Sequence, residues 1–221
     1  MNRIPFDPYD FFGYLASGLL VVVGMEVTIG FPHILGQDLK IVDSAVLLLA
    51  IYVAGQMIAT PAKALLEDGL VAKLLGRPNV NLFRVKKPWV RGHLFPGFYK
   101  SFPEQTRKKI QARAQSQGVT GTGEDLFLHV RYNPDILEND KLMAKLDAFI
   151  NKYGFCRNLS FTSLTVGIGM TIMTMFGHSV DPELKRYTIT ALAGGVLLFY
   201  RYLKFFWQYS YEMFNTYGQG K

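Results

Sequence analysis

The chain has 221 residues, of which 49% are hydrophobic and 19% are charged, and its net charge is +7. A soluble domain usually carries about 25% charged residues, so the composition favours a membrane protein. The 17 Phe and 12 Tyr exclude a disordered chain, and the single Cys excludes an intrachain disulfide and a cysteine-based zinc site.

The first apolar stretch, residues 11–25, is short but continues past Glu26 in apolar residues. Crossing about 30 Å of hydrocarbon takes roughly 20 helical residues, which this extended stretch supplies. A secretory signal peptide is an alternative for it. Residues 1–10 carry two acidic side chains and no small-residue cleavage site follows, so we expect a membrane-spanning helix.

The second stretch, residues 44–62, has no charged side chain and predicts a second span. Thr60 and Pro61 resemble a helix cap followed by a first turn, and residues 62–75 are expected to continue span two until Gly76. Residues 77–100 contain three prolines and are expected to run over the surface.

Further helices are expected in the rest of this insert. Residues 101–104 read Ser-Phe-Pro-Glu, a capping-box pattern, and predict a helix to Gln117 that Gly118 ends. A short helix follows over residues 124–132. Asn139 then caps a helix that is expected to run into span three.

The third stretch, residues 158–180, is uncharged and is the clearest span. The fourth, residues 187–200, is short and continues past Arg201 and Lys204. Re-entrant or interfacial helices are alternatives for the two short stretches. We expect all four to cross, because these two basic side chains lie near one end and can reach the interface.

The distribution of basic residues predicts the orientation. Residues 63–157 hold 17 of the 24 Lys and Arg and 9 of the 17 acidic residues. Together with the termini, the side that carries this insert has 21 basic residues, against 3 on the other. Both termini and the insert are therefore expected on the cytoplasmic side of the membrane. Trp207, Tyr209 and Tyr211 would form an aromatic belt at the inner interface.

The predicted fold class is an all-α integral membrane protein with four transmembrane helices and a helical cytoplasmic insert between spans two and three. Three parts follow: residues 1–62 with the first transmembrane hairpin, the basic cytoplasmic domain 63–157, and residues 158–221 with the second hairpin and the C-terminus.

A basic and aromatic segment of the insert is expected to contact the membrane surface, through Lys86, Lys87, Trp89 and Arg91. The positive-inside rule and attraction to anionic lipid explain the basic insert, so we do not expect a nucleic-acid partner. The expected partners are the lipid bilayer, further copies of the chain and a cytoplasmic protein.

The sequence contains no catalytic signature. It has no phosphate-binding loop, dinucleotide fingerprint, nucleophile elbow or HExxH motif. The four His residues are scattered, and we predict no catalytic residue, no metal site and no cofactor. His93 and His129 would be the best candidates of a lipid-active membrane enzyme, but nothing pairs them with a nucleophile.

Small and hydroxyl-bearing residues recur at helical spacing within the spans, and Gln56 adds an amide to span two. The members of this set are Gly13, Ser17, Gly24, Gln56, Ser160, Ser163, Gly167, Thr171 and Thr174. Small faces let helix backbones approach closely, which favours a packing seam. A hydroxyl-lined aqueous path is the alternative. Positive charge is expected at the inner mouth, the cytoplasmic end of the spans, from Arg157, Arg201 and Lys204. Arg157 is expected to act there as an interfacial anchor.

Two segments carry a resemblance to a group of proteins. Residues 6–15 read FDPYDFFGYL and residues 153–158 read YGFCRN. Both are similar to segments of small, uncharacterised bacterial multi-span inner-membrane proteins. The resemblance implies a bacterial source and an association with antiphage defence, in which compact membrane proteins act as effectors.

These features predict a non-enzymatic, homo-oligomeric membrane protein. Its helices would form a pore or perturb the membrane, and the insert would sense a signal or direct assembly. The alternative is a membrane anchor or scaffold that recruits a cytoplasmic partner through the insert.

Overall fold

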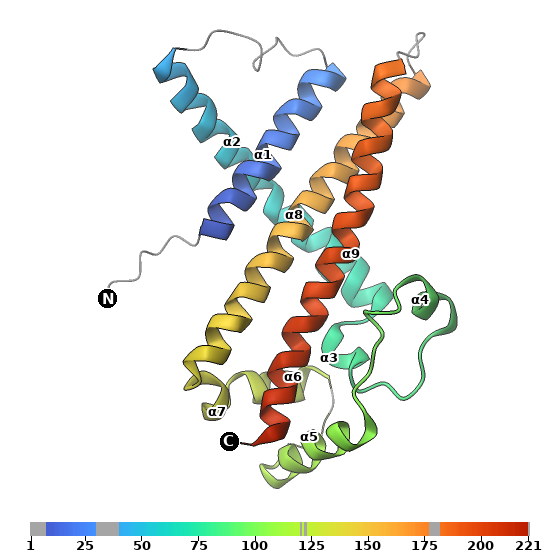
Figure 1. The fold of residues 1–221 in the computed structure, drawn as a ribbon. Helices are drawn as coiled ribbons and strands as arrows, with labels where there is room; N and C mark the ends of the chain where they lie inside the picture. The colour runs from blue at the N-terminus through green and yellow to red at the C-terminus, as the bar shows by residue number, and fades with distance from the viewer. Residues whose placement is uncertain (1–7, 30–39, 120, 122, 177–181, 221) are drawn as a thin grey trace. The chain divides into compact units, whose positions relative to one another are not determined.

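The computed structural model describes residues 8–29, 40–119, 121, 123–176 and 182–220 (Figure 1). These residues form helices and contain no β-strand. Four helical stretches among them are long and apolar enough to cross a membrane, which confirms the all-α class and the four predicted stretches. In chain order, the helices are α1 (Pro8–Ile29), α2 (Ile41–Ala62), a π-helix (Lys63–Leu75), α3 (Pro78–Asn81), α4 (Trp89–Leu94), α5 (Glu104–Ser116), α6 (Glu124–Arg131), α7 (Pro134–Leu137), α8 (Asp140–Phe176) and α9 (Pro182–Gln219).

The chain divides into two compact units. Unit 1 comprises residues 1–68 and 154–202, and unit 2 comprises residues 69–153 and 203–221. The π-helix, α8 and α9 each contribute residues to both units. Residues from Leu203 onward therefore cluster with the insert, whereas the sequence analysis grouped them with the second hairpin.

In unit 1, α1 and α2 cross with their backbones in direct contact (Figure 1). A Cβ atom added at Gly18 would lie 1.7 Å from the Ile51 carbonyl oxygen, and one added at Gly55 would lie 1.8 Å from that of Tyr14. Only glycine fits at either position. The two glycines thus fix where the first two helices meet.

The helix that follows α2 begins at a different residue from the one predicted. Pro61 lies inside α2 rather than in the first turn of a new helix, so the predicted cap at Thr60 is wrong. Proline has no N–H for the regular i to i−4 bond, and the wider π pairing begins two residues later, at Lys63. The predicted end at Gly76 is confirmed, with a φ of +80°.

Side chains from farther along the chain satisfy the carbonyl groups at the end of this π-helix. The Tyr99 hydroxyl donates to the Leu75 carbonyl at 2.7 Å, and Arg91 donates to the Leu74 carbonyl. Asn81 Nδ2 donates to the Gly76 carbonyl at 2.9 Å. Carbonyl groups at a helix end have no partner within the helix, so these donors stabilise its end.

Unit 2 has its own apolar core, contributed by α5, α6, α7, the loop after α3, and the unit 2 segments of α8 and α9. Its fully buried side chains include Leu82, Ile110, Leu126, Leu146 and Phe214. The surface excursion predicted for residues 77–100 is therefore only partly right. Its two ends are buried in unit 2, and the segment between them is exposed.

The ends of the unit 2 helices test the predicted caps. The Asn139 side chain accepts a bond from the Leu142 amide at 3.0 Å, which confirms that cap. The capping box at Ser101 is wrong, because Pro103 holds the N-cap position and no side chain caps α5. The amide of Phe102 is bonded instead to the Leu82 carbonyl at 2.9 Å, which fixes the chain before the helix.

The three residues of the predicted aromatic belt pack within unit 2, and their position at a membrane interface stays a prediction. Trp207 Nε1 donates to the Lys100 carbonyl at 2.9 Å, and its ring stacks on Tyr211. Tyr209 is buried, and its hydroxyl accepts a bond from Arg131 at 2.5 Å. Tyr209 thus belongs to the unit 2 core, and Trp207 and Tyr211 are partly buried against it.

Candidate functional site

The small-residue face of α8 packs against α9 within unit 1. Ser160 Oγ donates to the Gly195 carbonyl at 2.8 Å, and Ser163 Oγ donates to the Ala191 carbonyl at 2.7 Å. Both serines are buried. Hydrogen bonds of this kind between membrane helices contribute about 0.6 kcal/mol each on average.

Two glycines bring these helices close together. A Cβ atom at Gly167 would lie 2.7 Å from the Leu192 side chain, and one at Gly195 would lie 2.7 Å from that of Leu164. Each glycine therefore accepts a leucine from the facing helix. This alternation of glycine and leucine, together with the serine bonds, is the pattern of a close helix–helix seam.

The small residues of α1 pack against a different face of α8. A Cβ atom at Gly24 would lie 2.6 Å from the Val166 side chain, and one at Gly13 would lie 3.2 Å from that of Phe155. Ser17, which is fully buried, donates to the Gly13 carbonyl of its own helix at 2.8 Å. α8 thus packs on two sides, against α1 and against α9.

The remaining polar members of the predicted set bond within their own helices. Thr171 Oγ1 donates to the Gly167 carbonyl, and Thr174 Oγ1 to the Thr171 carbonyl, each at 2.8 Å. The Gln56 amide donates to the Tyr52 hydroxyl at 2.9 Å, and its side chain is exposed on α2. The hydrogen bonds of these side chains do not involve Ser160 or Ser163.

A largely buried ion pair lies at one end of the unit 1 helices. An Arg157 nitrogen lies 2.5 Å from a Glu67 carboxylate oxygen, and the two side chains are 13% and 16% exposed. The Asn158 side chain accepts two further bonds from the guanidinium at 3.2 Å. Removing either charge would leave the other without compensation in a dry environment, which is costly.

The other two predicted inner-mouth residues, Arg201 and Lys204, are exposed. Lys86, Lys87 and Trp89 are exposed as well, on the loop around α4. Arg91 is bonded to the Leu74 carbonyl, so its guanidinium holds the chain in place.

The two candidate histidines belong to separate hydrogen-bond networks. His93 Nδ1 lies 2.6 Å from the Trp89 carbonyl, and His129 Nε2 lies 2.8 Å from Gln117 Oε1. Within the described ranges, no group of three or more His, Cys, Asp or Glu side chains could hold a metal ion.

Sequence reasoning missed Gly18, Glu67 and the α9 side of the seam. Gly18 follows Ser17 directly and therefore lies off the face of Gly13 and Ser17 that the spacing selected. The signal for Glu67 is weak, since it stands beside Asp68 in a segment that reads as a charged cytoplasmic continuation. The neighbouring glycines 194 and 195 within an apolar span could have indicated a close approach to another helix.

Comparison with known proteins gives no relative: no family model, no curated protein and no solved structure matches the chain.

Proposed function

We propose that the chain is a non-enzymatic scaffold of a bacterial inner membrane. Its unit 1 helices would anchor it, and unit 2 would recruit a soluble protein at the cytoplasmic face. The observation that carries this proposal is the use of the small-residue faces. Gly13, Gly24, Ser160, Ser163 and Gly167 all contact helices of the same chain.

This packing argues against an aqueous path along the α8 face. A channel lining needs polar groups that are free to replace the water around a permeating ion. On α8, the hydroxyl groups of Ser160, Ser163, Thr171 and Thr174 each donate to a backbone carbonyl. The face therefore lacks uncommitted donors, as expected for an anchor.

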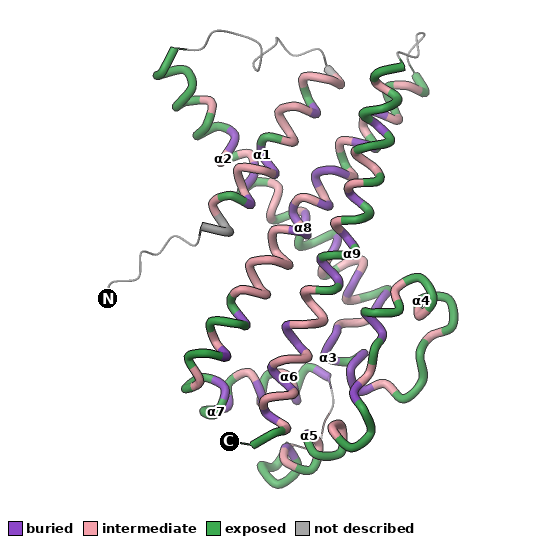
Figure 2. Tube along the Cα trace, viewed as in Figure 1, coloured by how far each residue is buried: buried purple, intermediate pink, exposed green. Residues whose placement is uncertain are grey.

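A pore formed between several copies is the second candidate, and Gln56 is the observation that favours it. Gln56 is exposed on α2, and so are its apolar neighbours Val53 and Met57. Figure 2 shows that much of α2 is exposed. An amide that faces lipid is costly, and a neighbouring copy would shield it. Such an oligomer would agree with the association with antiphage defence that the resemblance to small bacterial inner-membrane proteins implies.

The orientation rests on the excess of 21 basic residues over 3 across the predicted spans. A reporter that is active only in the periplasm should be on when it is fused after Gln37 or Val180. It should be off when it is fused after Gly118 or Lys221. The inverse pattern would refute the charge argument and, with it, a cytoplasmic unit 2.

Purification of the full chain from its own membranes tests the scaffold. We expect one soluble protein in a fixed molar ratio, retained in Lys86→Gln/Lys87→Gln and lost when residues 77–152 are deleted. Reversal of the exposed charges Lys108 and Lys109 on α5 tests the same surface without a deletion. Planar-bilayer recordings test the pore: reproducible conductance that Gln56→Leu abolishes would overturn the scaffold in favour of the second candidate.

A further inference from the structure

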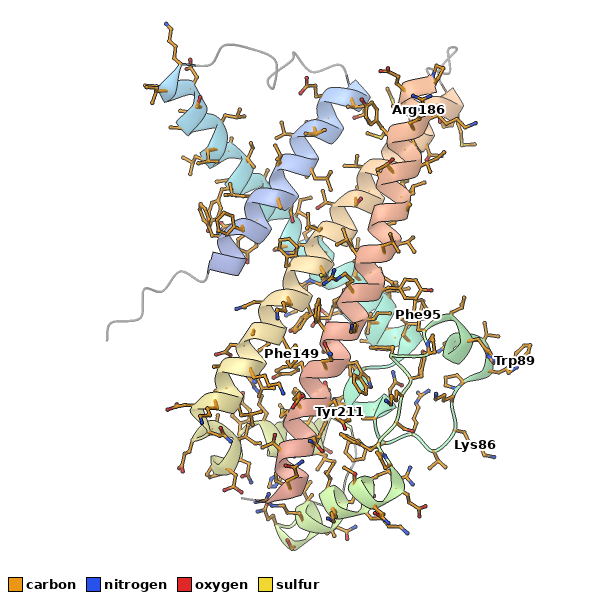
Figure 3. The ribbon with its side chains drawn as sticks, in the orientation of Figure 1. Lys86, Trp89, Phe95, Phe149, Arg186 and Tyr211 are labelled. Atoms are coloured by element: carbon orange, nitrogen blue, oxygen red, sulfur yellow. The ribbon has the colours of Figure 1, made fainter. Side chains whose placement is uncertain are left out.

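Residues 84–97, named here the α4 loop, combine exposed apolar side chains with positive charge. Trp89 is 80% exposed and Val85 is 79% exposed, and Val90 and Leu94 are exposed as well. Figure 3 shows Trp89 and Lys86 projecting outward from this loop. Between residues 69 and 103 the sequence has seven basic residues and no acidic one.

The α4 loop is held firmly at its base. The residues before it, Leu82 and Phe83, and those after it, Phe98 and Tyr99, are buried in unit 2. Inside the loop, the Arg91 guanidinium bonds to the Leu74 carbonyl. The exposed apolar side chains are thus presented by a segment that is anchored at both ends, and Arg91, which is itself exposed, helps to position it.

The loop is attached to the π-helix that follows α2. Leu74 and Leu75, which Arg91 and Tyr99 bind, belong to the helical stretch Ile41–Asn81, which contains an apolar window long enough to cross a membrane, and they lie beyond its uncharged residues 44–62. A basic segment with exposed Trp and aliphatic side chains has the composition of peptides that lie in a headgroup layer. Positive charge beside such side chains also selects anionic over neutral headgroups.

We propose that the α4 loop binds anionic lipid at the surface of the membrane that holds unit 1. Trp89, Val85 and Val90 enter the boundary between headgroups and acyl chains, and Lys86 and Lys87 pair with lipid phosphates. The scaffold function is not required for this contact, so either proposal can fail alone. Attraction of a basic residue to an anionic surface is worth about fivefold in the binding equilibrium, so the two lysines together contribute roughly thirtyfold.

Trp89 itself reports on the contact, since the chain has only one other tryptophan, Trp207. The full chain carrying Trp207→Phe is reconstituted in vesicles of phosphatidylcholine, with or without 30% phosphatidylglycerol. Emission is quenched from the lipid side with brominated acyl chains and from the water side with acrylamide. As a second route, the emission of Trp89→Phe is subtracted from that of the wild-type chain. The remainder is the emission of Trp89, obtained without altering Trp207.

We expect Trp89 to be quenched by brominated lipid, and protected from acrylamide at least twofold, only in the anionic vesicles. Lys86→Gln/Lys87→Gln should abolish this difference. Lys108→Gln/Lys109→Gln removes the same charge from α5 and should leave it intact. Arg91→Gln should weaken the lipid quenching while both lysines remain.

Three results would overturn the proposal. The first is equal acrylamide quenching in both vesicle types. The second is an equal effect of the α4 and α5 lysine pairs, which would indicate a general charge effect. The third is protection of Trp89 by a single-stranded oligonucleotide in neutral vesicles that exceeds protection by anionic lipid, which would assign the loop to nucleic acid.

Discussion

The crossing of α1 and α2 offers a direct test of the packing in unit 1. The atoms nearest to a Cβ at Gly55 or Gly18 are backbone carbonyl oxygens, at 1.8 and 1.7 Å. No side-chain rotation can relieve such a clash. For Gly55→Ala, the helices must separate by about 1.2 Å before the contact reaches 3.0 Å, below which Cβ atoms essentially never approach another atom.

That separation weakens every contact at the crossing, because a gap of about 0.5–1 Å already forfeits a quarter to a half of a dispersion contact. We therefore expect Gly55→Ala to lower the free energy of unfolding by about 3 kcal/mol, the upper end of the usual cost of overpacking. Gly18→Ala should cost a similar amount. The double variant should cost little more than either single one, because one separation accommodates both methyl groups.

Unfolding in mixed micelles of dodecyl maltoside and sodium dodecyl sulfate, followed by circular dichroism, measures these free energies. Gly169→Ala is the matched control, because a Cβ there meets no atom within 4 Å. We expect it to be neutral or to stabilise by up to about 1 kcal/mol. A Gly55→Ala protein within about 0.5 kcal/mol of wild type, the range of a neutral surface substitution, would refute the crossing.

Three further predictions concern other contacts. Gly167→Leu should cost about 1–3 kcal/mol in the same assay, because it forces α8 and α9 apart; an unchanged unfolding curve would contradict the seam. Glu67→Gln should cost about 3 kcal/mol, the lower end of the range for a buried pair, because Arg157 keeps its charge without a carboxylate and both side chains are slightly exposed. The exchange variant Glu67→Arg/Arg157→Glu should recover at least half of that loss, and no recovery would argue against the pairing. Burial raises the pKa of the Tyr99 hydroxyl, against the opposing charge of two nearby arginines. Because the hydroxyl ionises first in the unfolded chain, near pH 10, its contribution is constant below that pH and lost above it. The free energy of unfolding should therefore fall less steeply above pH 10 in Tyr99→Phe than in wild type, and equal slopes would exclude this role.

Local signals in the sequence predicted the helical elements well. The four apolar stretches, the helix end at Gly76 and the cap at Asn139 all depend on residues within one or two turns. Glycine at positive φ ends a helix wherever it stands, and an asparagine reaches only the amides that follow it. Such features need no knowledge of the rest of the chain.

Features set by distant residues could not be predicted in this way. Trp207, Tyr209 and Tyr211 follow an apolar span, as interfacial aromatic residues do, and only the tertiary fold places them against unit 2. The contact between α8 and α9 could not be predicted from the sequence for the same reason. The spacing of Ser160 and Ser163 put both on one helix face, but the spacing could not say whether that face meets another helix or water.

The unit 2 core joins residues that the ribosome makes at very different times. Its walls come from residues made early, such as Leu82 and Leu126, and from Met213, Phe214 and Tyr217, made much later. Arg113 bonds to the Tyr217 carbonyl across 104 positions. At translation rates of about 5–20 residues per second, the early part of this core waits roughly 5–20 seconds for its missing side. During that interval, apolar side chains that end up buried are open to chaperones and to aggregation. Closure of this core is therefore a late event in synthesis of the chain.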